Sequence, residues 1–411
     1  MGMKRRDFFQ ASMAAGAPMM QAAAQTGTKP AIRITDIKTH FLGAGGRNFC
    51  FVQVFTDQGI HGVGEAYSCG PDLAVAAVIE DFKSWLIGQD PRNIEHLFNM
   101  MYNFTRFPGG LVVNAAISGI EHALWDIAGK AAGLPVYMLL GGKCREKIRV
   151  YQSAGGEEPS AVAESAKRLV EKYGYTAIKM RPQPSHDNSR PYNAITRGAA
   201  ARVRAVREAL GPDVDIGCDI HARFFEVSRA IRLARAIEPY NPMWLEEPIR
   251  CENENVMQKL SQHVNIPLAS GECNYMRHEF RKILALQALD IIQPDICLTG
   301  GLLEMKKIAS MAEAHYVMVA PHNPMGPVAT AVNVHFAAST QNFFILEYHP
   351  DDASPRKDML KEPLMVKDGY IPVPTKPGLG VELNEEAFRM YPTKSWHRGF
   401  DYRADGSVGY I

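Results

Sequence analysis

Six acidic or histidine residues recur in this chain at a nearly constant interval. They are Asp219, Glu246, Glu272, Asp295, His322 and Glu347, so the successive gaps are 27, 26, 23, 27 and 25 residues. Each lies at or next to the C-terminal end of a short apolar run: VDIGCD, MWLEE, IPLASGE, IIQPD, YVMVAPH and FFILE. An interval of this size accommodates one strand, one helix and two loops, the repeat of a (β/α)8 barrel. Because such a barrel brings the C-terminal ends of its strands to one face, we expect these six side chains to meet there.

The chain is long enough for a barrel and a second, smaller unit, because 411 residues exceed one ordinary domain. Apolar runs alternate with amphipathic segments, such as 225–238 and 301–315, across residues 148–350. This alternation predicts the α/β class and a parallel barrel. Its strands are expected near 148–153, 175–181, 214–219, 243–247, 266–271, 290–294, 316–321 and 343–348. A doubly wound open sheet is the alternative, but it would not normally place functional side chains on six consecutive strands.

Residues 31–147 have the pattern of an α+β unit. The segment 51–66 alternates across a turn at Asp57-Gln58-Gly59, which predicts a β-hairpin. Helices are expected near 72–88, 93–103 and 112–132, the last ending before Gly133-Leu134-Pro135. The tail, 351–411, contains Pro/Gly-rich turns at 373–381 and is too long to be a frayed end. We therefore expect it to pack back onto the first unit.

Composition narrows the class of partner. The hydrophobic fraction of 46% and the charged fraction of 22% are those of a soluble globular protein. A net charge of +1 leaves no electrostatic footprint for nucleic acid or an anionic membrane surface. No apolar run reaches the length of roughly 20 residues that a membrane span needs. The seven cysteines form no CxxC pair, so we expect buried thiols that pack as small hydrophobic groups.

The first 30 residues differ from the rest. The run Lys4-Arg5-Arg6-Asp7-Phe8-Phe9-Gln10 precedes an Ala/Met-rich stretch that ends in Ala22-Ala23-Ala24. This is the layout of a bacterial twin-arginine export signal with a small-residue cleavage site, so we expect a periplasmic protein. A disordered basic tail that is not cleaved, on a cytoplasmic protein, is the alternative.

Three carboxylates predict a metal site. Asp219, Glu246 and Glu272 end three adjacent strands, and oxygen ligands without Cys or His favour Mg²⁺ over Zn²⁺. Octahedral Mg²⁺ would keep about three positions for water or an anionic substrate. Glu247 follows Glu246 directly and should leave the strand on the opposite face, so we assign Glu246 as the ligand.

Five further residues suggest acid–base chemistry beside that metal. Asp295 and His322 end the next two strands, and a carboxylate that holds one imidazole nitrogen raises the basicity of the other. Lys179 and Arg181 lie on one side of the second strand, where Arg181 can bind a carboxylate but is a poor base. His221 lies two residues beyond Asp219 and can protonate a leaving group from the side opposite His322.

The chain resembles the enolase superfamily, in the mandelate racemase subgroup, and most closely the sugar-acid dehydratases of the galactonate dehydratase kind. The resemblance runs from about residue 34 to 395. It is carried by AAISGIEHALWDIAGKAAGLPVYMLLGG (115–142), CDIHAR (218–223), WLEEP (244–248), IPLASGE (266–272), IIQPD (291–295), MAEAHYVMVAPHNPMGPVATA (311–331) and TKPGLGVEL (375–383). It implies a (β/α)7β barrel under an α+β capping domain that is built from residues 31–147 and the tail 351–411.

The resemblance also implies roles. Asp219, Glu246 and Glu272 would bind one Mg²⁺, the Asp295–His322 pair would abstract the proton α to the substrate carboxylate, and Glu347 would hydrogen-bond the enediolate. His221 would protonate the departing 3-hydroxyl, Lys179 would touch the substrate carboxylate, and Arg181 would touch the position beside it. Segments 42–50, expected as a loop, and 67–72 would close over the sugar, with Arg47, Tyr67 and Arg106 as contacts. The relatives form even-numbered assemblies, which implies a homo-oligomer.

One departure bears on the reaction. Racemases of this family carry Lys-x-Lys on the second strand, whereas Arg181 stands at the second position here. One base and one acid fit β-elimination of water from an aldonate, which gives a 2-keto-3-deoxy acid. Two alternatives stay open: an epimerase or cycloisomerase of the same superfamily, and an exported sugar-acid-binding protein without turnover.

Overall fold

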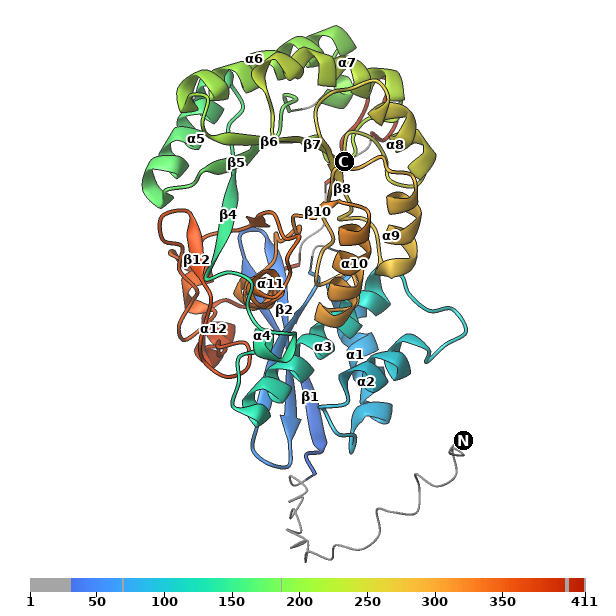
Figure 1. Ribbon diagram of the computed structural model, residues 1–411, viewed down its shortest axis with the longest axis vertical. Helices are drawn as coiled ribbons and strands as arrows, with labels where there is room; N and C mark the ends of the chain where they lie inside the picture. Colours follow the sequence, from blue (N-terminus) through green and yellow to red (C-terminus); the bar gives the residue numbers. More distant parts are fainter. Residues whose placement is uncertain (1–30, 69, 186, 396–398, 410–411) are drawn as a thin grey trace, which may run out of the picture. The chain divides into compact units, whose positions relative to one another are not determined.

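A computed structural model of the chain describes residues 31–68, 70–185, 187–395 and 399–409 (Figure 1). The predicted export signal at residues 1–30 lies outside this range. The compact unit Ile32–Ile411 carries every element discussed below. Among the described residues, none of the helices has the length and apolar character needed to cross a membrane.

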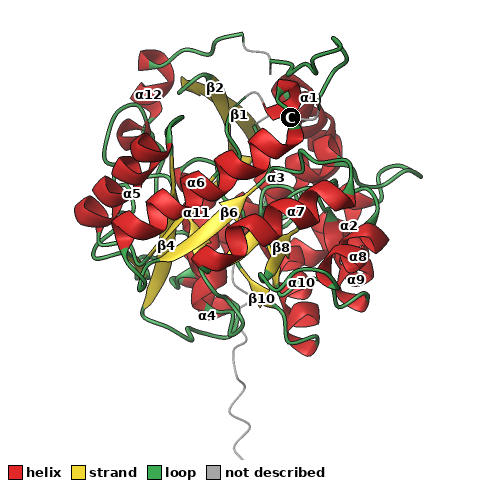
Figure 2. Ribbon diagram, turned by 90° about the horizontal axis from the view of Figure 1, so that it is seen from above, coloured by secondary structure: helices red, strands yellow, loops and turns green. Residues whose placement is uncertain are grey.

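The larger part of this unit is a parallel barrel. Its strands lie side by side in the order β10-β9-β8-β7-β6-β5-β4-β11, and Val319 of β10 also pairs with Phe343, just before β11, which closes the ring. A helix lies in each of the seven connections, and the helices surround the strands (Figure 2). The strands are β4 (Lys147–Ala154), β5 (Ala177–Met180), β6 (Asp215–Asp219), β7 (Trp244–Glu246), β8 (Leu268–Ser270), β9 (Ile291–Ile292), β10 (Met318–Val319) and β11 (Leu346–Glu347). The helices are α5 (Pro159–Tyr173), α6 (Tyr192–Leu210), α7 (Val227–Ile237), α8 (Glu254–Ser261), α9 (Met276–Ala285), α10 (Leu302–Ala314) and α11 (Pro327–Ala338). The predicted fold class is confirmed.

A layer of side chains fills the barrel interior and forms a floor beneath the strand ends. Its members are Tyr151, Ala177, Trp244, Ala269, Ile291, Ala320 and Ile345. The Trp244 ring meets Tyr151 edge-on at 5.5 Å between centroids, and a Cβ at Gly217 would lie 3.0 Å from the indole. Glycine at 217 therefore leaves the room that Trp244 occupies. Since inward positions alternate along a strand, Lys179 and Glu246 lie one layer above Ala177 and Trp244, at the C-terminal face.

The capping part combines an antiparallel sheet with helices. The sheet has the order β1 (Ile34–Ala44), β2 (Arg47–Thr56), β3 (His61–Ala66), and the predicted hairpin at 51–66 lies in its β2–β3 pair. The helices are α1 (Asp72–Leu86), α2 (Ile94–Tyr102), α3 (Leu111–Ala132) and α4 (Val136–Leu139). The prediction of a loop at 42–50 is wrong. The strands β1 and β2 run to Ala44 and from Arg47, and only Gly45 (φ 60°) and Gly46 (φ 86°) form the turn, because glycine tolerates the left-handed backbone of a tight hairpin.

The tail returns to both parts of the unit. Strand β12 (Tyr370–Pro372) pairs antiparallel with the first half of β4. Farther on, Gly378 pairs with Pro135, and Leu379 N donates to Asp126 Oδ1 of α3 at 2.8 Å. Helix α12 (Glu385–Met390) then packs beside β1. Among the described cysteines, Cys50, Cys218 and Cys297 are buried as expected, whereas the prediction is wrong for Cys144 and Cys273, which are exposed in connecting loops.

Two buried carboxyl groups of the cap hold barrel helices by their N-termini. Glu121 of α3 accepts hydrogen bonds from Leu302 N (2.8 Å) and Leu303 N (2.9 Å) at the start of α10. Glu65 of β3 accepts from Gly326 N (2.5 Å) and Ala329 N (2.9 Å) at the start of α11. Each carboxyl thereby satisfies backbone donors that a helix end leaves without an intrahelical partner. The two helices follow the loops that carry Asp295 and His322, so the cap fixes that side of the barrel mouth.

We predict that Glu121→Ala lowers the free energy of unfolding by about 1–3 kcal/mol, because buried N–H donors lose their acceptor. Urea unfolding followed by circular dichroism measures the change. The matched control is Glu95→Ala, whose carboxylate also joins the cap to α10 by pairing with Lys307 at 2.7 Å but is 57% exposed. We expect a change below about 0.5 kcal/mol there. Equal effects at the two positions would contradict this account of the interface.

The same two carboxyls predict a pH dependence of stability. Burial raises the pKa of Glu65 and of Glu121 to about 7, although the backbone donors favour the charged form. The folded protein then holds these protons more tightly than the unfolded chain, whose carboxyls titrate near 4.5. Their contribution to the free energy of unfolding is fully present below about pH 4.5 and is lost as the pH rises to about 7. We expect Glu65→Ala/Glu121→Ala to show a flatter profile over this window, by at most about 3 kcal/mol per group. Urea unfolding at a series of pH values tests this, and parallel profiles would refute it.

Candidate active site

The six strand-end residues converge at the C-terminal face of the barrel. Asp219, Glu246 and Glu347 are the last residues of β6, β7 and β11. Glu272 follows β8 by two residues. Asp295 and His322 follow β9 and β10 and pair with each other as an isolated parallel bridge. The barrel geometry thus brings together side chains that are spread over 129 positions of the sequence, from 219 to 347.

Three carboxylates form a group suited to a cation. One oxygen each from Asp219, Glu246 and Glu272 lies within 4.8 Å of the others. Burial raises the pKa of Asp219 and of Glu246, and repulsion from neighbouring carboxylates adds to it. Trp244 Nε1 donates to Glu246 Oε2 at 2.9 Å and fixes the orientation of that carboxylate. An all-oxygen donor set of this kind fits a hard divalent cation.

Lys179 is the cation that the described residues place among these carboxylates. Its Nζ lies 3.0 Å from Asp219 Oδ2, from Glu246 Oε1 and from Glu347 Oε1, and its side chain is 6% exposed. Burial alone would lower the pKa of Lys179, but the three carboxylates outweigh it and raise the pKa well above its usual value. The ammonium group stays charged, so Lys179 supplies positive charge here and is a poor base.

The Asp295–His322 pair has the geometry of an oriented imidazole. His322 Nδ1 lies 2.8 Å from Asp295 Oδ2, and His322 Nε2 lies 3.6 Å from Glu272 Oε2. Burial works against a charged imidazole, yet attraction to Glu272 and Asp295 raises the pKa of His322 well above its usual value. The pair therefore has a high affinity for a proton, with Nε2 facing the carboxylate group.

Glu347 joins the metal side to the His322 side. One of its oxygens pairs with Lys179, and the other accepts a hydrogen bond from Asn323 N at 3.0 Å. Burial would raise the pKa of Glu347, but Lys179 and His322 lower it well below its usual value. Glu347 is thus an ionised acceptor at any working pH.

His221 lies on a strained turn beside the first carboxylate. Its Nε2 is 3.2 Å from Asp219 Oδ2, and its backbone N–H donates to Asp219 Oδ1 at 2.9 Å. His221 and Ala222 have φ values of 56° and 51°, which cost of order 1 kcal/mol each for residues other than glycine. The side chain is 47% exposed, so His221 borders both the buried carboxylates and the open side of the site.

Glu247 forms a second group with Glu272 and Cys273. One ligand atom from each lies within 4.8 Å of the others. Burial raises the pKa of Glu247 well above its usual value, and Glu272 adds to the effect. Glu246 belongs to the all-carboxylate group with Asp219, whereas Glu247 belongs to a group that includes a thiol, so a hard cation favours Glu246. Glu247 is itself buried, and the assignment of Glu246 rather than Glu247 as the ligand stays a prediction.

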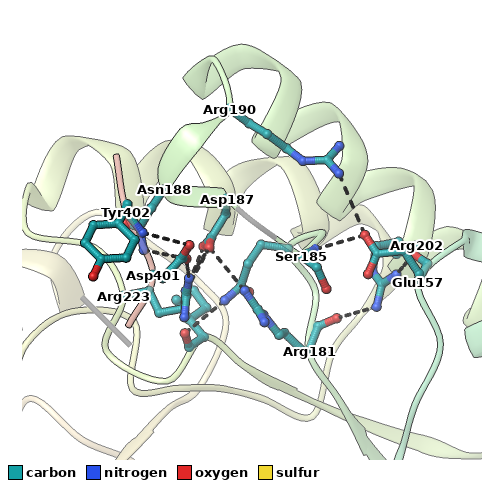
Figure 3. Close-up of polar contacts among 12 residues, drawn as sticks. Glu157, Arg181, Ser185, Asp187, Asn188, Arg190, Arg202, Arg223, Asp401 and Tyr402 are labelled. Carbon is teal, nitrogen blue, oxygen red and sulfur yellow. Dashed lines mark hydrogen bonds and ion pairs between the residues drawn. The ribbon is translucent and has the colours of Figure 1, made fainter. Parts of the chain in front are cut away.

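Arg181 makes an ion pair within the protein. Its guanidinium donates to Asp187 Oδ1 at 3.1 Å, and Arg202 donates to its backbone carbonyl at 3.2 Å (Figure 3). Asp187 also accepts from Arg223, so one buried carboxylate joins two arginines. Asp187 therefore fixes the position of the Arg181 guanidinium. The expected contact of Arg181 with substrate stays a prediction.

The predicted cap contacts lie in different surroundings. The Arg47 guanidinium donates to the carbonyl of Pro324, two residues beyond His322, and lies 4.6 Å over the Phe49 ring. Tyr67 is half-buried between the cap core and the barrel core. Arg106 is exposed in the loop between α2 and α3. The structure thus brings Arg47 to the His322 loop, whereas the described part of the chain provides no comparable contact for Arg106.

Sequence reasoning assigned no role to Asp187, Arg223 or Asp401, which form the network around Arg181. Arg223 lies in the quoted run CDIHAR, two residues beyond His221, so the spacing that selected His221 also pointed to it. Asp187 begins a single 3-10 turn (Asp187–Ser189), and Asp401 lies in a short C-terminal hairpin, so neither belongs to an element long enough for periodicity to mark inward-facing residues.

Comparisons with known proteins decide the family. Family profiles match at residues 24–141 (mandelate racemase/muconate lactonizing enzyme, N-terminal domain) and 161–387 (enolase C-terminal domain-like). The chain belongs to the mandelate racemase/muconate lactonizing enzyme family. A D-galactonate dehydratase of Pectobacterium atrosepticum is 38% identical over 388 residues, covering 92% of this chain and 99% of the relative. A D-galactonate dehydratase of Variovorax paradoxus is 38% identical over 390 residues, with the same coverage.

Solved structures agree with this placement. An enolase from Agrobacterium radiobacter, solved with Na and L-malate bound and an ordered active site, superposes with a TM-score of 0.88 at 38% identity, covering 92% of this chain and 100% of that one. A mandelate racemase/muconate lactonizing enzyme-like protein from Roseovarius gives a TM-score of 0.83 at 36% identity, covering 88% and 96%. As a family member with dehydratase relatives along nearly its whole length, the protein is a hydro-lyase of the enolase superfamily.

We predict that Glu246→Gln weakens binding of a divalent cation by about 100-fold or more, because it removes one of three charged ligands, whereas outer partners alone are worth 10–100-fold. Isothermal titration with Mg²⁺ measures the affinity. The matched control is the neighbouring Glu247→Gln, for which we expect less than about a threefold change. The reverse order would place the cation in the group of Glu247, Glu272 and Cys273 instead.

Proposed function

We propose that the protein is a Mg²⁺-dependent dehydratase of aldonic acids such as galactonate, and that it forms 2-keto-3-deoxy acids. The observation that carries the proposal is the unequal arrangement of proton-transfer groups: an Asp–His pair lies on one side only. Asp295 and His322 form a base on one side of the carboxylate group, and His221 lies on the other. Arg181, at the position where a racemase has its second base, is held in an ion pair with Asp187.

The residues present fit the metal that the family implies. Asp219, Glu246 and Glu272 would hold it, and Lys179 and Glu347 lie beside these carboxylates. When bound, Mg²⁺ would supply positive charge that stabilises the enediolate and offsets the attraction of Glu272 for the His322 proton. A related enolase has been solved with the 2-hydroxy acid L-malate, which supports an acid with a hydroxyl beside its carboxylate as the substrate class.

The proposed reaction uses two proton transfers, one by His322 and one by His221, whose strands β10 and β6 lie across the barrel from each other. His322 Nε2 removes the proton from carbon 2, and the C–H electron pair enters the enediolate. The Lys179 ammonium group lies beside the developing negative charge, and Glu347 holds Lys179 in place by its ion pair. The C3–O bond then breaks, and His221 donates the proton with which the hydroxyl leaves as water. The resulting enol takes up a proton at carbon 3 and loses one from oxygen to give the keto acid. In this scheme only His322 acts as a base, so inversion of configuration at carbon 2, which needs a second base on the other face, is disfavoured.

The test is a panel of hexonates and pentonates incubated with the purified protein and Mg²⁺, scored for keto acid. We expect turnover of at least one aldonate, and His322→Asn should lower kcat by 10²–10⁴-fold, the usual contribution of a general base. His278→Asn, in an exposed position on α9, is the control and should leave kcat unchanged.

The same incubation in D₂O separates the alternatives. Deuterium at carbon 2 of recovered substrate without keto acid would show epimerisation rather than dehydration. Binding of an aldonate without exchange or product, unchanged in His322→Asn, would show a binding protein. Either outcome overturns the proposed function.

A further inference from the structure

The C-terminal segment folds as a small hairpin at the barrel mouth. Tyr402 and Val408 pair as an antiparallel bridge, and Arg403 N donates to Ser407 O at 2.8 Å. Gly409 N donates to Asp401 O at 2.8 Å, which holds the base of the hairpin. The hairpin packs on the irregular segment after β5, since a Cβ on Gly409 would lie 2.4 Å from the Asn188 side chain.

Asp401 connects this hairpin to the residues around Arg181. Its carboxylate forms an ion pair with Arg223 and accepts a hydrogen bond from Asn188 Nδ2 at 2.8 Å (Figure 3). Arg223 in turn donates to both oxygens of Asp187, at 2.8 and 3.1 Å. The side chains of Asp187, Arg223 and Asp401 are only 3, 9 and 18% exposed. Charged groups with so little access to water interact more strongly than surface pairs do.

The network ends at Arg181 and at Arg223, the residue that follows the His221–Ala222 turn. Arg223 closes the turn in which His221 and Ala222 adopt left-handed backbone conformations. Such strained residues persist only where the surroundings over-determine them. On one side, the turn is held by β7 and the residue after it, because Ile220 N donates to Glu246 O and Ala222 N to Glu247 O. Before the turn, Gln183 Nε2 donates to Ile220 O at 2.9 Å, and His221 N donates to Asp219 Oδ1 at 2.9 Å. The residue that follows the turn is Arg223, which Asp187 and Asp401 hold.

A cavity of about 700 Å³ adjoins the network. Its lining includes Asp187, Arg223 and Phe224 from the barrel and Arg403 and Asp405 from the hairpin. The C-terminal segment therefore forms one wall of the space beside the His221 turn. Earlier in the tail, Lys394 exchanges two hydrogen bonds with Asn48 of the cap, each at 3.1 Å, so the tail contacts both the cap and the barrel mouth.

We propose that Asp401 is a positioning residue for the leaving-group side of the active site, where it acts through Arg223 and Asp187 to hold the His221 turn and Arg181. This inference rests on the proposed dehydration. It separates the two halves of the reaction, since the network reaches His221 and has no described contact with Asp295 or His322. Asp401 touches neither substrate nor metal ligands in this role.

The test uses two substrates that differ in their need for an acid. An aldonate found active in the panel loses hydroxide, which needs a proton, whereas its 3-deoxy-3-fluoro analogue loses the weakly basic fluoride ion, which needs far less help. In the full-length protein with Mg²⁺, we expect Asp401→Asn to lower kcat for the hydroxy acid by about tenfold or more, because a misplaced catalytic group commonly costs that much. For the fluoro acid we expect less than about a threefold loss.

Asp405→Asn is the matched control, because Asp405 lies in the same hairpin and bonds Ser407 within it. It should leave both substrates unaffected. If Asp401→Asn does not fold, Asp401→Glu keeps the charge on a longer arm and should show the same selective loss at smaller size. An equal loss for both substrates would show that Asp401 has a merely structural role. No loss for either substrate would show that Asp401 has no role in turnover. Either result overturns the inference while the wild-type panel still reports on the proposed function. A wild type that forms no keto acid overturns both.

Discussion

The contact of Lys179 with three carboxylates is the interaction on which the rest of the site depends. Five carboxyl groups gather at the strand ends, from Asp219, Glu246, Glu272, Asp295 and Glu347, and Lys179 is the one lysine that pairs with them among the described residues. Buried like charges at these distances repel each other by several kcal/mol unless a cation compensates. The raised pKa values of Asp219 and Glu246 show that Lys179 compensates only in part. A divalent ion would complete the balance, which is the physical reason to expect one at this face of the barrel.

The two sides of this charged centre are supported by different parts of the chain. The Asp295 and His322 loops lead into α10 and α11, whose N-termini are held by Glu121 and Glu65 of the cap. The His221 turn is instead tied to the C-terminal hairpin through Arg223 and Asp401. The order of elements along the chain makes this possible, because the cap precedes the barrel and the tail follows it. In the proposed reaction, proton removal and leaving-group departure would therefore depend on separate sets of contacts.

Much of this arrangement could be predicted from the sequence, and the physical reason is strand periodicity. A constant interval between polar residues that follow apolar runs predicts which side chains share the mouth of a barrel, and Asp219, Glu246 and His322 were found in this way. The loop expected at 42–50 was wrong because two consecutive glycines indicate a turn but not how short it is, and here the strands continue to Ala44 and Arg47. The Asp401 network could not be predicted. Asp187 and Asp401 lie 214 positions apart, in a single 3-10 turn and in a short terminal hairpin, where no periodicity relates one side chain to another.

The position of Arg181 shows why the network of Asp187, Arg223 and Asp401 matters for the reaction. An arginine at this position cannot act as a base, so the sequence alone already disfavours two-way proton transfer. The structure adds that Asp187 neutralises and orients the guanidinium, and that the same carboxylate also binds Arg223 at the end of the His221 turn. A racemase needs two equivalent bases on opposite faces. Here the side opposite His322 carries His221 on a strained turn, and Arg181, whose partner Asp187 also binds the residue after that turn. In the proposed function His221 protonates the departing hydroxyl, and Arg181 cannot return a proton to carbon 2. This arrangement supports the proposed elimination over inversion.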